Sequence, residues 1–512
     1  MSALNPRAPI IVGVGDLTDT DTPASLGRSP YDLIAQAARL ALADTQSTDI
    51  IGSIDTVAML RSYADTSHRF ATRLGGSSNP PKSLADRLGL NAKRYIYTWN
   101  GGNMPQYLVN DFAEAISRGE MRAALVAGGE ALRTQHALER AQSDISWHED
   151  PGGAPELIGD PRRGWNDEED RHGMRAAIAM YPLFENAIRG QRKASVDEHM
   201  QSMARLMARF ADVARQNPLA TRRAGWSAER LSAVDEENRW IGFPYSRFMV
   251  SNAFIDQAAA FIVTSVQVAQ ECGIPREKWV YLHGCADAHD TWYTSERYDL
   301  HSSPAMRAAS RQALDMAGCG IGDIDILDIY SCFPSAVEIA CKELGIKEDD
   351  HRNLTVTGGL VYFGGPGNSY VVLSICEMMR RLRAAPGKRG LITANGNWVT
   401  KHSYGIYSTT PPRQPWERAA PAMLQAELDR LPAAPVARQP AGRAVIETYT
   451  VMHDRSGPSF AIVLGRLAAT NERFIANTPD DLATLNDLQA RESLGRAGTV
   501  TQRGGLNLFT PD

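Results

Sequence analysis

The sequence predicts a layered α/β protein built from two similar halves, followed by a small β-barrel-like module. Two stretches, residues 98–130 and 357–397, share one order of elements: a glycine-rich turn, an apolar helix, a buried strand and, at the end, a glycine-containing turn. Strand and helix patterns also alternate through residues 8–130, which is typical of a sheet covered by helices. Because the two stretches repeat one pattern, we expect two halves that face each other, with any active site between them.

The first glycine unit begins with TWNGGNMPQ. Asn103 stands where a helix N-cap is expected, Pro105 is favoured in a first turn, and Gly119 is placed to end the helix. A helix that begins at a glycine turn exposes free backbone N–H groups and the positive end of its dipole. At this turn we therefore expect a nucleophile, an oxyanion or a phosphate.

The first half is expected to comprise residues 1–131 and 241–275. The stretch between them, residues 132–240, changes to long polar helices rich in Arg, Glu and Met, and it predicts an inserted helical subdomain that closes over a site. The elements predicted for the first half are strands 8–15, 54–60, 123–127 and 260–264 and helices 30–44, 83–88 and 103–119.

Residues 276–410 are expected to form the second half, with strands at 279–284, 324–329 and 390–394 and a helix at 303–316. Residues 411–443 are rich in proline and alanine and predict a linker around one short helix. In the last part of the chain, residues 444–512, short alternating strands at 444–451, 459–467 and 473–476 predict a small, separate barrel-like module.

The composition indicates a globular protein with sizeable cores. The chain has 512 residues, of which 43% are hydrophobic, and this length suggests about two to four domains. A net charge of -5 offers no broad basic field, which argues against nucleic acid as the principal partner. The N-terminus shows no basic stretch followed by a long apolar run, and no apolar window has the length of a membrane span. We therefore expect a cytoplasmic protein with no membrane partner.

The six cysteines all lie between positions 272 and 376, without a CxxC pair or zinc-like spacing to histidines. This pattern argues against disulfides and a structural metal. Most of these cysteines are expected to be buried as small hydrophobic side chains.

Short motifs recur through residues 8–410: TWN at 98–100, AGG at 127–129, DQAAA at 256–260, YSCF at 330–333 and NGN at 395–397. Together they resemble the motifs of the thiolase superfamily. Thr98, Asn100 and the triplet at 127–129 (AGG) stand at the spacings of the family's nucleophile motif, and the tetrapeptide at 330–333 (YSCF) matches its N-E-A-F or H-D-C-F motif. The family's D-G-A-A-A motif is matched by residues 256–260 (DQAAA). The same correspondence puts Asn103 at the nucleophilic cysteine, Gly365 at the catalytic histidine, and the triplet at 395–397 (NGN) at the last cysteine motif.

With the C-terminal module, the chain looks most like the thiolase-like proteins of type 1, which resemble sterol-carrier thiolases and carry an additional oligonucleotide-fold-like domain. The resemblance implies the five-layered αβαβα thiolase fold and an acyltransferase family label. It implies a coenzyme A thioester as substrate or ligand, with no tightly bound cofactor. It also implies homodimerisation through the sheet layers, which the extra module could obstruct.

The departures from the thiolase motifs argue against conventional thiolase activity. Thiolysis needs a thiolate, a histidine that activates it and a second cysteine that moves a proton. This chain has Asn103, Gly365 and Asn395 at those three positions. An amide is not a nucleophile, and glycine has no side chain to act as a base.

Four residues are candidate catalytic groups. Tyr330 is either an acid or oxyanion donor, or an aromatic ring packed at a strand end. Asn103 either donates a hydrogen bond to a thioester oxygen or only caps its helix. His402 is either a base or a structural histidine, and Asn395 keeps a polar group at the last motif. Cys332 is either a displaced nucleophile or inert packing. The residues expected to bind the substrate are Cys332, Phe333, Gly364, Gly365, Pro366 and Gly396.

Three functions remain open from the sequence. The first is acyltransferase-family chemistry on a coenzyme A thioester without a cysteine nucleophile. The second is retro-aldol cleavage of a β-hydroxyacyl-CoA, which needs only a base and enolate stabilisation. The third is a scaffold that binds acyl-CoA without turnover.

Overall fold

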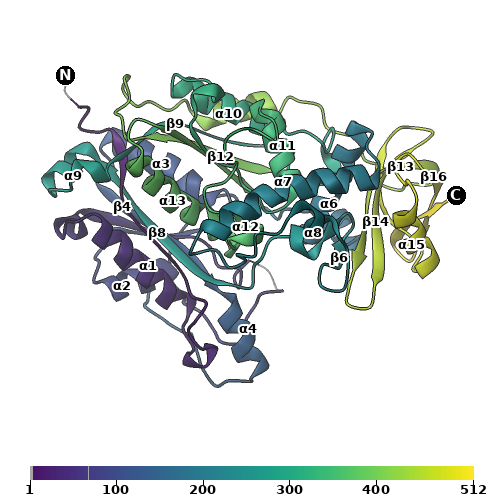
Figure 1. The fold of residues 1–512 in the computed structure, drawn as a ribbon, viewed down its shortest axis with the longest axis horizontal. Helices are drawn as coiled ribbons and strands as arrows, with labels where there is room; N and C mark the ends of the chain where they lie inside the picture. Colours follow the sequence, from purple (N-terminus) through teal and green to yellow (C-terminus); the bar gives the residue numbers. More distant parts are fainter. Residues whose placement is uncertain (1–3, 67–68) are drawn as a thin grey trace.

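A computed structural model of the chain describes residues 4–66 and 69–512 (Figure 1). Two sets of strands form its main sheet. The first half contributes β1 (Pro9–Thr18), β2 (Ile54–Met59), β3 (Arg94–Thr98), β4 (Ala123–Ala131) and β8 (Asp256–Ser265). The second half contributes β9 (Val280–His289), β10 (Ile326–Asp328), β11 (Arg389–Gly396) and β12 (Lys401–Ser408).

The two halves repeat one strand order, as the two glycine units predict. The first half reads β3-β2-β4-β8-β1 across the sheet, and the second reads β10-β11-β12-β9. If β3 is left out and the strands of each half are counted in chain order, both halves have the same order across the sheet: second, third, fourth and first. Antiparallel pairing of Ile10 with Tyr281 and of Ile11 with Val280 joins β1 to β9, so the halves share one sheet.

Helices form three layers around these strands, which confirms the predicted αβαβα architecture (Figure 1). Helices α1 (Pro30–Asp44) and α2 (Pro80–Leu88) cover the outer face of the first half. On the second half, α10 (Pro304–Met316) covers β9 and β12, and α11 (Pro334–Leu344) packs beside α10. Between the halves lie α3 (Met104–Arg118) and α13 (Tyr370–Ala384), which contact each other and strands of both halves.

Helices provide most of the regular structure between β4 and β8. Its long helix α7 (Val196–Gln216) buries Met203, Met207 and Phe210 in the core that surrounds α3 and α13. The other elements of this insertion are α4 (Leu132–Arg140), β5 (Glu156–Ile158), α5 (Asp167–Arg171), α6 (Ala177–Arg192), α8 (Ala228–Ser232), β6 (Trp240–Gly242) and β7 (Tyr245–Ser246). The remaining short helices of the two halves are α9 (Val266–Glu271) and α12 (Gly359–Tyr362).

The C-terminal strands close into a five-stranded barrel, which confirms the predicted barrel-like module. The first strand, β13 (Gly442–His453), pairs with both β14 (Pro458–Leu467) and β16 (Ala497–Arg503). The circle is completed by β15 (Arg473–Asn477), which pairs with β14 and β17 (Leu506–Pro511), and by the pairing of β17 with β16. Helix α14 (Pro421–Leu428) lies in the linker before the barrel, and α15 (Leu482–Ala490) lies between β15 and β16.

The barrel packs closely on the inserted helices. Strand β6 extends its sheet through the pairing of Gly242 with Met452. Helix α6 contacts β13 directly: the Asn186 side chain donates to the Tyr449 carbonyl at 2.8 Å, and Thr448 donates to the Leu183 carbonyl at 2.7 Å.

Several elements differ from the sequence prediction. Strand β12 was not expected beyond the turn at 395–397. Strands β16 and β17 were missed because their run of Thr, Gln, Arg and Gly gives only a weak apolar alternation. The three residues of β5 are too few to give a pattern.

Strand β5 covers the sheet edge at β3. It pairs in parallel with β3, matching Ile96 with Glu156 and Thr98 with Ile158. An uncovered edge strand offers unpaired N–H and C=O groups to a second chain. Here those groups of β3 are used within the chain.

We therefore expect a monomer by size-exclusion chromatography with light scattering. Replacing residues 155–159 by a Gly-Ser segment of equal length should uncover β3 and produce dimers that increase with protein concentration. The same replacement at the adjacent residues 151–154 is the control and should leave a monomer. A wild-type dimer at low micromolar concentration would contradict the prediction.

None of the helices in the described residues is long and apolar enough to cross a bilayer.

Candidate functional site

The candidate site lies where the N-terminus of α3 meets β11, β12 and the segment after β10. A Cβ atom on Gly102 would lie 2.3 Å from the Tyr330 hydroxyl oxygen and 2.6 Å from the Asn395 carbonyl oxygen. A Cβ atom on Gly101 would lie 2.4 Å from Asn103 Oδ1 and 2.9 Å from Lys401 Nζ. Only glycine permits so close an approach. The structure thus brings together Asn103, Tyr330 and Asn395, as the sequence predicts, and adds Lys401.

Two backbone donors of the turn are free. The Gly101 N–H donates to Asn368 Oδ1 at 3.0 Å, and the Met104 N–H donates to the Gly101 carbonyl at 3.0 Å. Within residues 4–66 and 69–512, the N–H groups of Gly102 and Asn103 have no acceptor. These groups lie at the positive end of the α3 dipole. They are therefore suited to bind an oxyanion or a polarised carbonyl oxygen.

The Asn103 side chain does not cap α3. Its Nδ2 lies 3.4 Å from Ser403 Oγ on β12, a long hydrogen bond, and its Oδ1 is buried with no partner in the described part of the chain. The capping interpretation is therefore wrong. The amide is turned toward the strand that faces the helix.

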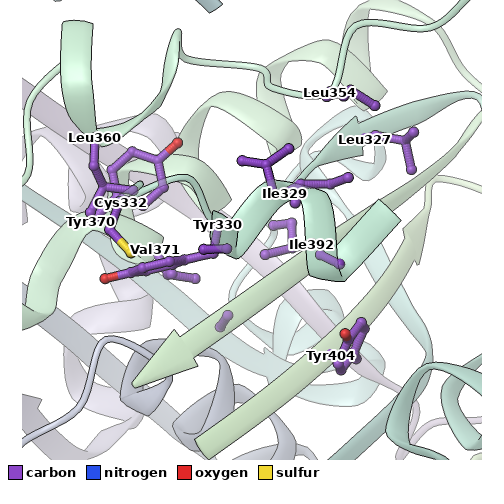
Figure 2. Close-up of a cluster of buried hydrophobic side chains, with 14 of the residues drawn as sticks. Leu327, Ile329, Tyr330, Cys332, Leu354, Leu360, Tyr370, Val371, Ile392 and Tyr404 are labelled. Carbon is purple, nitrogen blue, oxygen red and sulfur yellow. The ribbon is translucent and has the colours of Figure 1, made fainter. Parts of the chain in front are cut away.

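Tyr330 follows β10 and is held by its backbone. Its N–H donates to Thr393 Oγ1 at 3.0 Å, and its ring stands perpendicular to Tyr370 at 5.7 Å between centroids. Figure 2 shows Tyr330, Cys332 and Tyr370 gathered at one end of the apolar cluster. Burial raises the pKa of the Tyr330 phenol well above its usual value, so the hydroxyl stays protonated. Among the described residues this hydroxyl has no hydrogen-bond partner, so it is a free donor next to Gly102.

Asn395 and Cys332 both contact Tyr181 of α6. Asn395 Nδ2 donates to the Tyr181 hydroxyl at 3.2 Å, and the Tyr181 ring stacks on Phe333 at 4.4 Å. Burial raises the pKa of the Cys332 thiol to about 12, although the nearby Tyr181 hydroxyl lowers it in part. Cys332 is therefore an uncharged thiol, which favours its interpretation as inert packing over that as a displaced nucleophile.

The structure does not bring His402 to this site. Side chains alternate along β12: Ser403 faces Asn103 of α3, whereas His402 faces α10, the outer layer. Its Nε2 lies 3.2 Å from Asp290 Oδ2 and 3.1 Å from the Val399 carbonyl. Figure 2 shows Tyr404, two residues along the same face, apart from Tyr330. The prediction of His402 as the base is therefore wrong, because one step along a strand reverses the side chain.

The turn before β12 has an unusual backbone. Asn397, Trp398 and Val399 have φ values of +49°, +54° and +62°, a left-handed conformation that is rare for a β-branched residue. Arg297 donates to the Val399 carbonyl at 2.5 Å and to Thr400 Oγ1 at 2.9 Å. His402 contacts the same carbonyl, so its observed role is to hold this turn.

The loop of Gly364, Gly365 and Pro366 supports the site indirectly. Cβ atoms on Gly364 and Gly365 would lie 2.2 Å from the Gln257 side-chain oxygen and 2.5 Å from Ser251 Oγ, so the loop packs on these residues. Gly396 is at the site itself, since its Cβ would lie 2.7 Å from Asn103 Oδ1. Beyond Pro366 the chain reaches Asn368, which accepts from Gly101.

Lys401 is a site residue that the sequence reasoning missed. Its Nζ donates to the Asn100 carbonyl and lies 5.8 Å from the centre of the Trp292 ring. Burial lowers the pKa of this amine to about 8, while Asp160 raises it and Arg162 lowers it. A single lysine between Thr400 and His402 belongs to no recognised motif, so the sequence gave no pattern that could identify it.

The loop 159–165 lies over this amine. Arg162 stacks on Trp292, with 3.7 Å between its Cζ and the ring centre, and the Trp292 indole donates to the Arg163 carbonyl at 2.7 Å. Trp165 lies 6.4 Å from Trp398 between ring centres. The insertion therefore covers the site at both α6 and this loop.

Glu130 is a second buried ionisable group near the second glycine unit. It accepts from the Tyr63 N–H at 2.8 Å and from Ser62 Oγ at 3.2 Å, and burial raises its pKa to about 8. It lines a cavity of about 150 Å³ with Tyr31, Asp65, Gln135 and Trp147.

Three buried residues are close enough to hold a metal ion. Ligand atoms of Glu185, His199 and Glu338 lie within 4.8 Å of one another. Arg192 pairs with Glu338 at 3.3 Å, and burial raises the pKa of Glu185 to about 7 and that of Glu338 well above its usual value. Burial thus favours the protonated form of both carboxyl groups, and Arg192 compensates charge on Glu338.

Comparisons with known proteins agree with this fold. Residues 286–409 match a family model described as "Thiolase C-terminal domain-like", and residues 423–505 match "Thiolase-like protein type 1 additional C-terminal domain". A monomeric SCP2-thiolase-like protein type 1 from Mycobacterium smegmatis, solved by crystallography, is 34% identical with a TM-score of 0.84. That comparison covers 99% of this chain and 100% of the other.

More distant relatives share parts of the chain. An acetyl-CoA acetyltransferase of Methanothermobacter thermautotrophicus is 27% identical over 158 residues, which are 28% of this chain and 40% of that protein. The Ltp2-ChsH2(DUF35) aldolase is 18% identical with a TM-score of 0.56, over 80% of this chain and 99% of that one. At this identity the aldolase shows a shared fold only.

Replacing Glu130 by Gln should change how stability depends on pH. A carboxyl group whose pKa is raised on folding stabilises the fold below its unfolded value, here 4.5, and loses that contribution as pH rises toward about 8. The free energy of unfolding of the wild type should therefore fall relative to Glu130→Gln by roughly 1.4 kcal/mol per pH unit across this range. Urea denaturation at several pH values measures it. Glu120→Gln, at an exposed position, is the control, and parallel curves for Glu130→Gln and wild type would refute the pKa shift.

Replacing His402 by Ala should lower the free energy of unfolding by about 2–4 kcal/mol, because Asp290 and the Val399 carbonyl lose a buried partner. His351→Ala, whose side chain is 88% exposed, should change it little. Denaturant titration of both variants measures the difference. A His402 variant as stable as the wild type would contradict the structural role.

Proposed function

The chain belongs to the family of SCP2-thiolase-like proteins of type 1, and from this membership we propose that it binds a coenzyme A thioester with the carbonyl oxygen at the N-terminus of α3. One observation carries the proposal: the free N–H groups of Gly102 and Asn103 and the free Tyr330 hydroxyl all lie at one turn. Donors that are fixed before the ligand arrives stabilise a polarised carbonyl without reorganisation.

The bound thioester would not pass through a cysteine-linked acyl enzyme. The Asn103 amide is not a nucleophile, and the Cys332 thiol stays protonated. The donors at the α3 turn instead favour reactions in which negative charge develops on the thioester oxygen.

A second candidate is retro-aldol cleavage of a β-hydroxyacyl-CoA. Its proton acceptor would be the Lys401 amine, whose pKa of about 8 leaves part of it uncharged near neutrality. The amine would take the β-hydroxyl proton, the bond between the α- and β-carbons would break to release an aldehyde or ketone, and the enolate would be held at the α3 turn. Tyr330 would then give its proton to the α-carbon of the enolate to form an acyl-CoA, and the proton taken up by Lys401 would return to the Tyr330 phenolate.

Calorimetric titration tests the binding site. Acetyl-CoA should bind roughly 5-fold or more tightly than free coenzyme A, because its carbonyl oxygen gains a hydrogen bond worth about 1 kcal/mol. Gly102→Ala should remove this preference, since the new methyl group occupies the space beside the Tyr330 hydroxyl. Gly52→Ala is the matched control, because a Cβ there meets nothing within 4 Å. If neither ligand binds the wild type, the proposal fails.

Replacing Tyr330 by Phe should abolish turnover of a β-hydroxyacyl-CoA while leaving coenzyme A binding within a few-fold. Mass spectrometry of the reaction mixture detects the aldehyde or ketone, and calorimetry measures binding. Tyr404→Phe removes a buried hydroxyl on the other face of β12 and should keep the wild-type rate. Unchanged turnover in Tyr330→Phe would remove this residue from the mechanism.

A further inference from the structure

The Lys401 side chain extends to the α3 turn, close to Asn103, which occupies the position of the thiolase nucleophile. Its Nζ and Asn103 Oδ1 both lie within 3 Å of the point where a Cβ on Gly101 would stand. Asn103 comes from α3 and Lys401 from β12, so the amine approaches the same turn from the opposite layer.

The surroundings of this amine favour its uncharged form. The side chain is 6% exposed, and its hydrogen-bond acceptor is the neutral carbonyl of Asn100. No carboxylate pairs with Lys401 within 4 Å among the described residues. The charged groups that act on it are Asp160 and Arg162, which pair with each other at 2.6 Å and largely cancel.

We propose that Lys401 is an acyl acceptor: it attacks the carbonyl carbon of a coenzyme A thioester bound at the α3 turn and becomes an Nε-acyl-lysine. This inference rests on the proposed function. The lone pair of Nζ forms the new C–N bond, the C–S bond breaks, and coenzyme A leaves as a thiolate that takes the proton lost by the amine. No oxidant, metal or further reactant is needed. Because an amide does not transfer its acyl group onward as a thioester does, the modification is stable.

The consequence is a self-limiting site. The acyl group would fill the space beside Gly101 and Gly102, where Asn103 Oδ1 and the Tyr330 hydroxyl stand. A molecule acylated at Lys401 should therefore bind coenzyme A thioesters more weakly than an unmodified one.

The experiment incubates the full chain with acetyl-CoA and maps acetyl-lysines by peptide mass spectrometry. Lys401 should acquire acetyl roughly tenfold faster than Lys388, whose side chain is 56% exposed and paired with Asp325, because bound reactants meet at high effective concentration. Acetylation of Lys401 should saturate with acetyl-CoA, be suppressed by free coenzyme A, and rise with pH through about 8. At Lys388 the rate should stay proportional to acetyl-CoA and be unaffected by coenzyme A.

Acetyl phosphate provides the chemical control, because it acetylates lysines but lacks the nucleotide. It should modify Lys388 and leave Lys401 nearly unmodified. Lys401→Arg should show the far-UV circular dichroism spectrum and thermal midpoint of the wild type, which shows that the variant is folded. Its own affinity for coenzyme A should not change on incubation with acetyl-CoA, whereas the affinity of the wild type should fall.

The outcomes separate the two proposals. Coenzyme A binding without acetylation of Lys401 overturns the acyl-acceptor role and leaves the binding site standing. Equal acetylation of Lys401 by acetyl phosphate also overturns it. Absence of coenzyme A binding overturns both.

Discussion

The close approach of α3 to β11 and β12 is the constraint on which the site depends. A Cβ on Gly396 would lie 3.0 Å from the Gly101 Cα, and a Cβ on Gly405 would lie 2.4 Å from Gln106 Nε2. Glycines on both partners therefore let a helix of one half lie directly on strands of the other. The same approach leaves two backbone donors of the turn unused and places a phenol and an amine beside them. The contact that holds the halves together thus also builds the binding geometry.

The charged and strained parts of the site are held from outside it. Arg297 and His402 fix the left-handed turn at Val399, and Asp290 connects His402 to the N-terminus of α10 through Ser303. In the described part of the chain, no hydrogen bond or ion pair joins Arg297, His402 or Asp290 to the α3 turn. These residues set the position of β12, and β12 in turn carries Ser403 and Lys401 toward α3. A buried polar cluster can be essential for geometry without taking part in chemistry.

The sequence predicted the α3 unit well because its signals are local. Glycine at 101, 102 and 119 and proline at 105 mark both ends of the helix, and α3 begins and ends within one residue of the predicted bounds. The second glycine unit repeats this pattern, and the prediction of two similar halves rested on that repeat.

The side-chain roles were harder to predict because they depend on strand direction. Without knowledge of β12, the motif Lys401-His402-Ser403 gave no indication of which residue faces α3, and histidine was chosen for its chemistry. Its neighbours on the strand, Lys401 and Ser403, are the residues that face α3. Glu130 and β5 were missed for a related reason: burial of one carboxylate and pairing of three residues arise from tertiary contacts, which leave no periodic trace in the sequence.

Helix α6 contacts both the candidate site and the C-terminal barrel. Near its N-terminus, Tyr181 accepts a hydrogen bond from Asn395 at the site. Between one and just over two turns later, Asn186 and Arg189 bind the barrel through Tyr449 and Glu492. This helix of 16 residues carries Pro182 between its two sets of contacts, a residue that weakens or kinks a helix interior. The position of the barrel and that of the Tyr181 hydroxyl are therefore set by one shared element, with a proline between them.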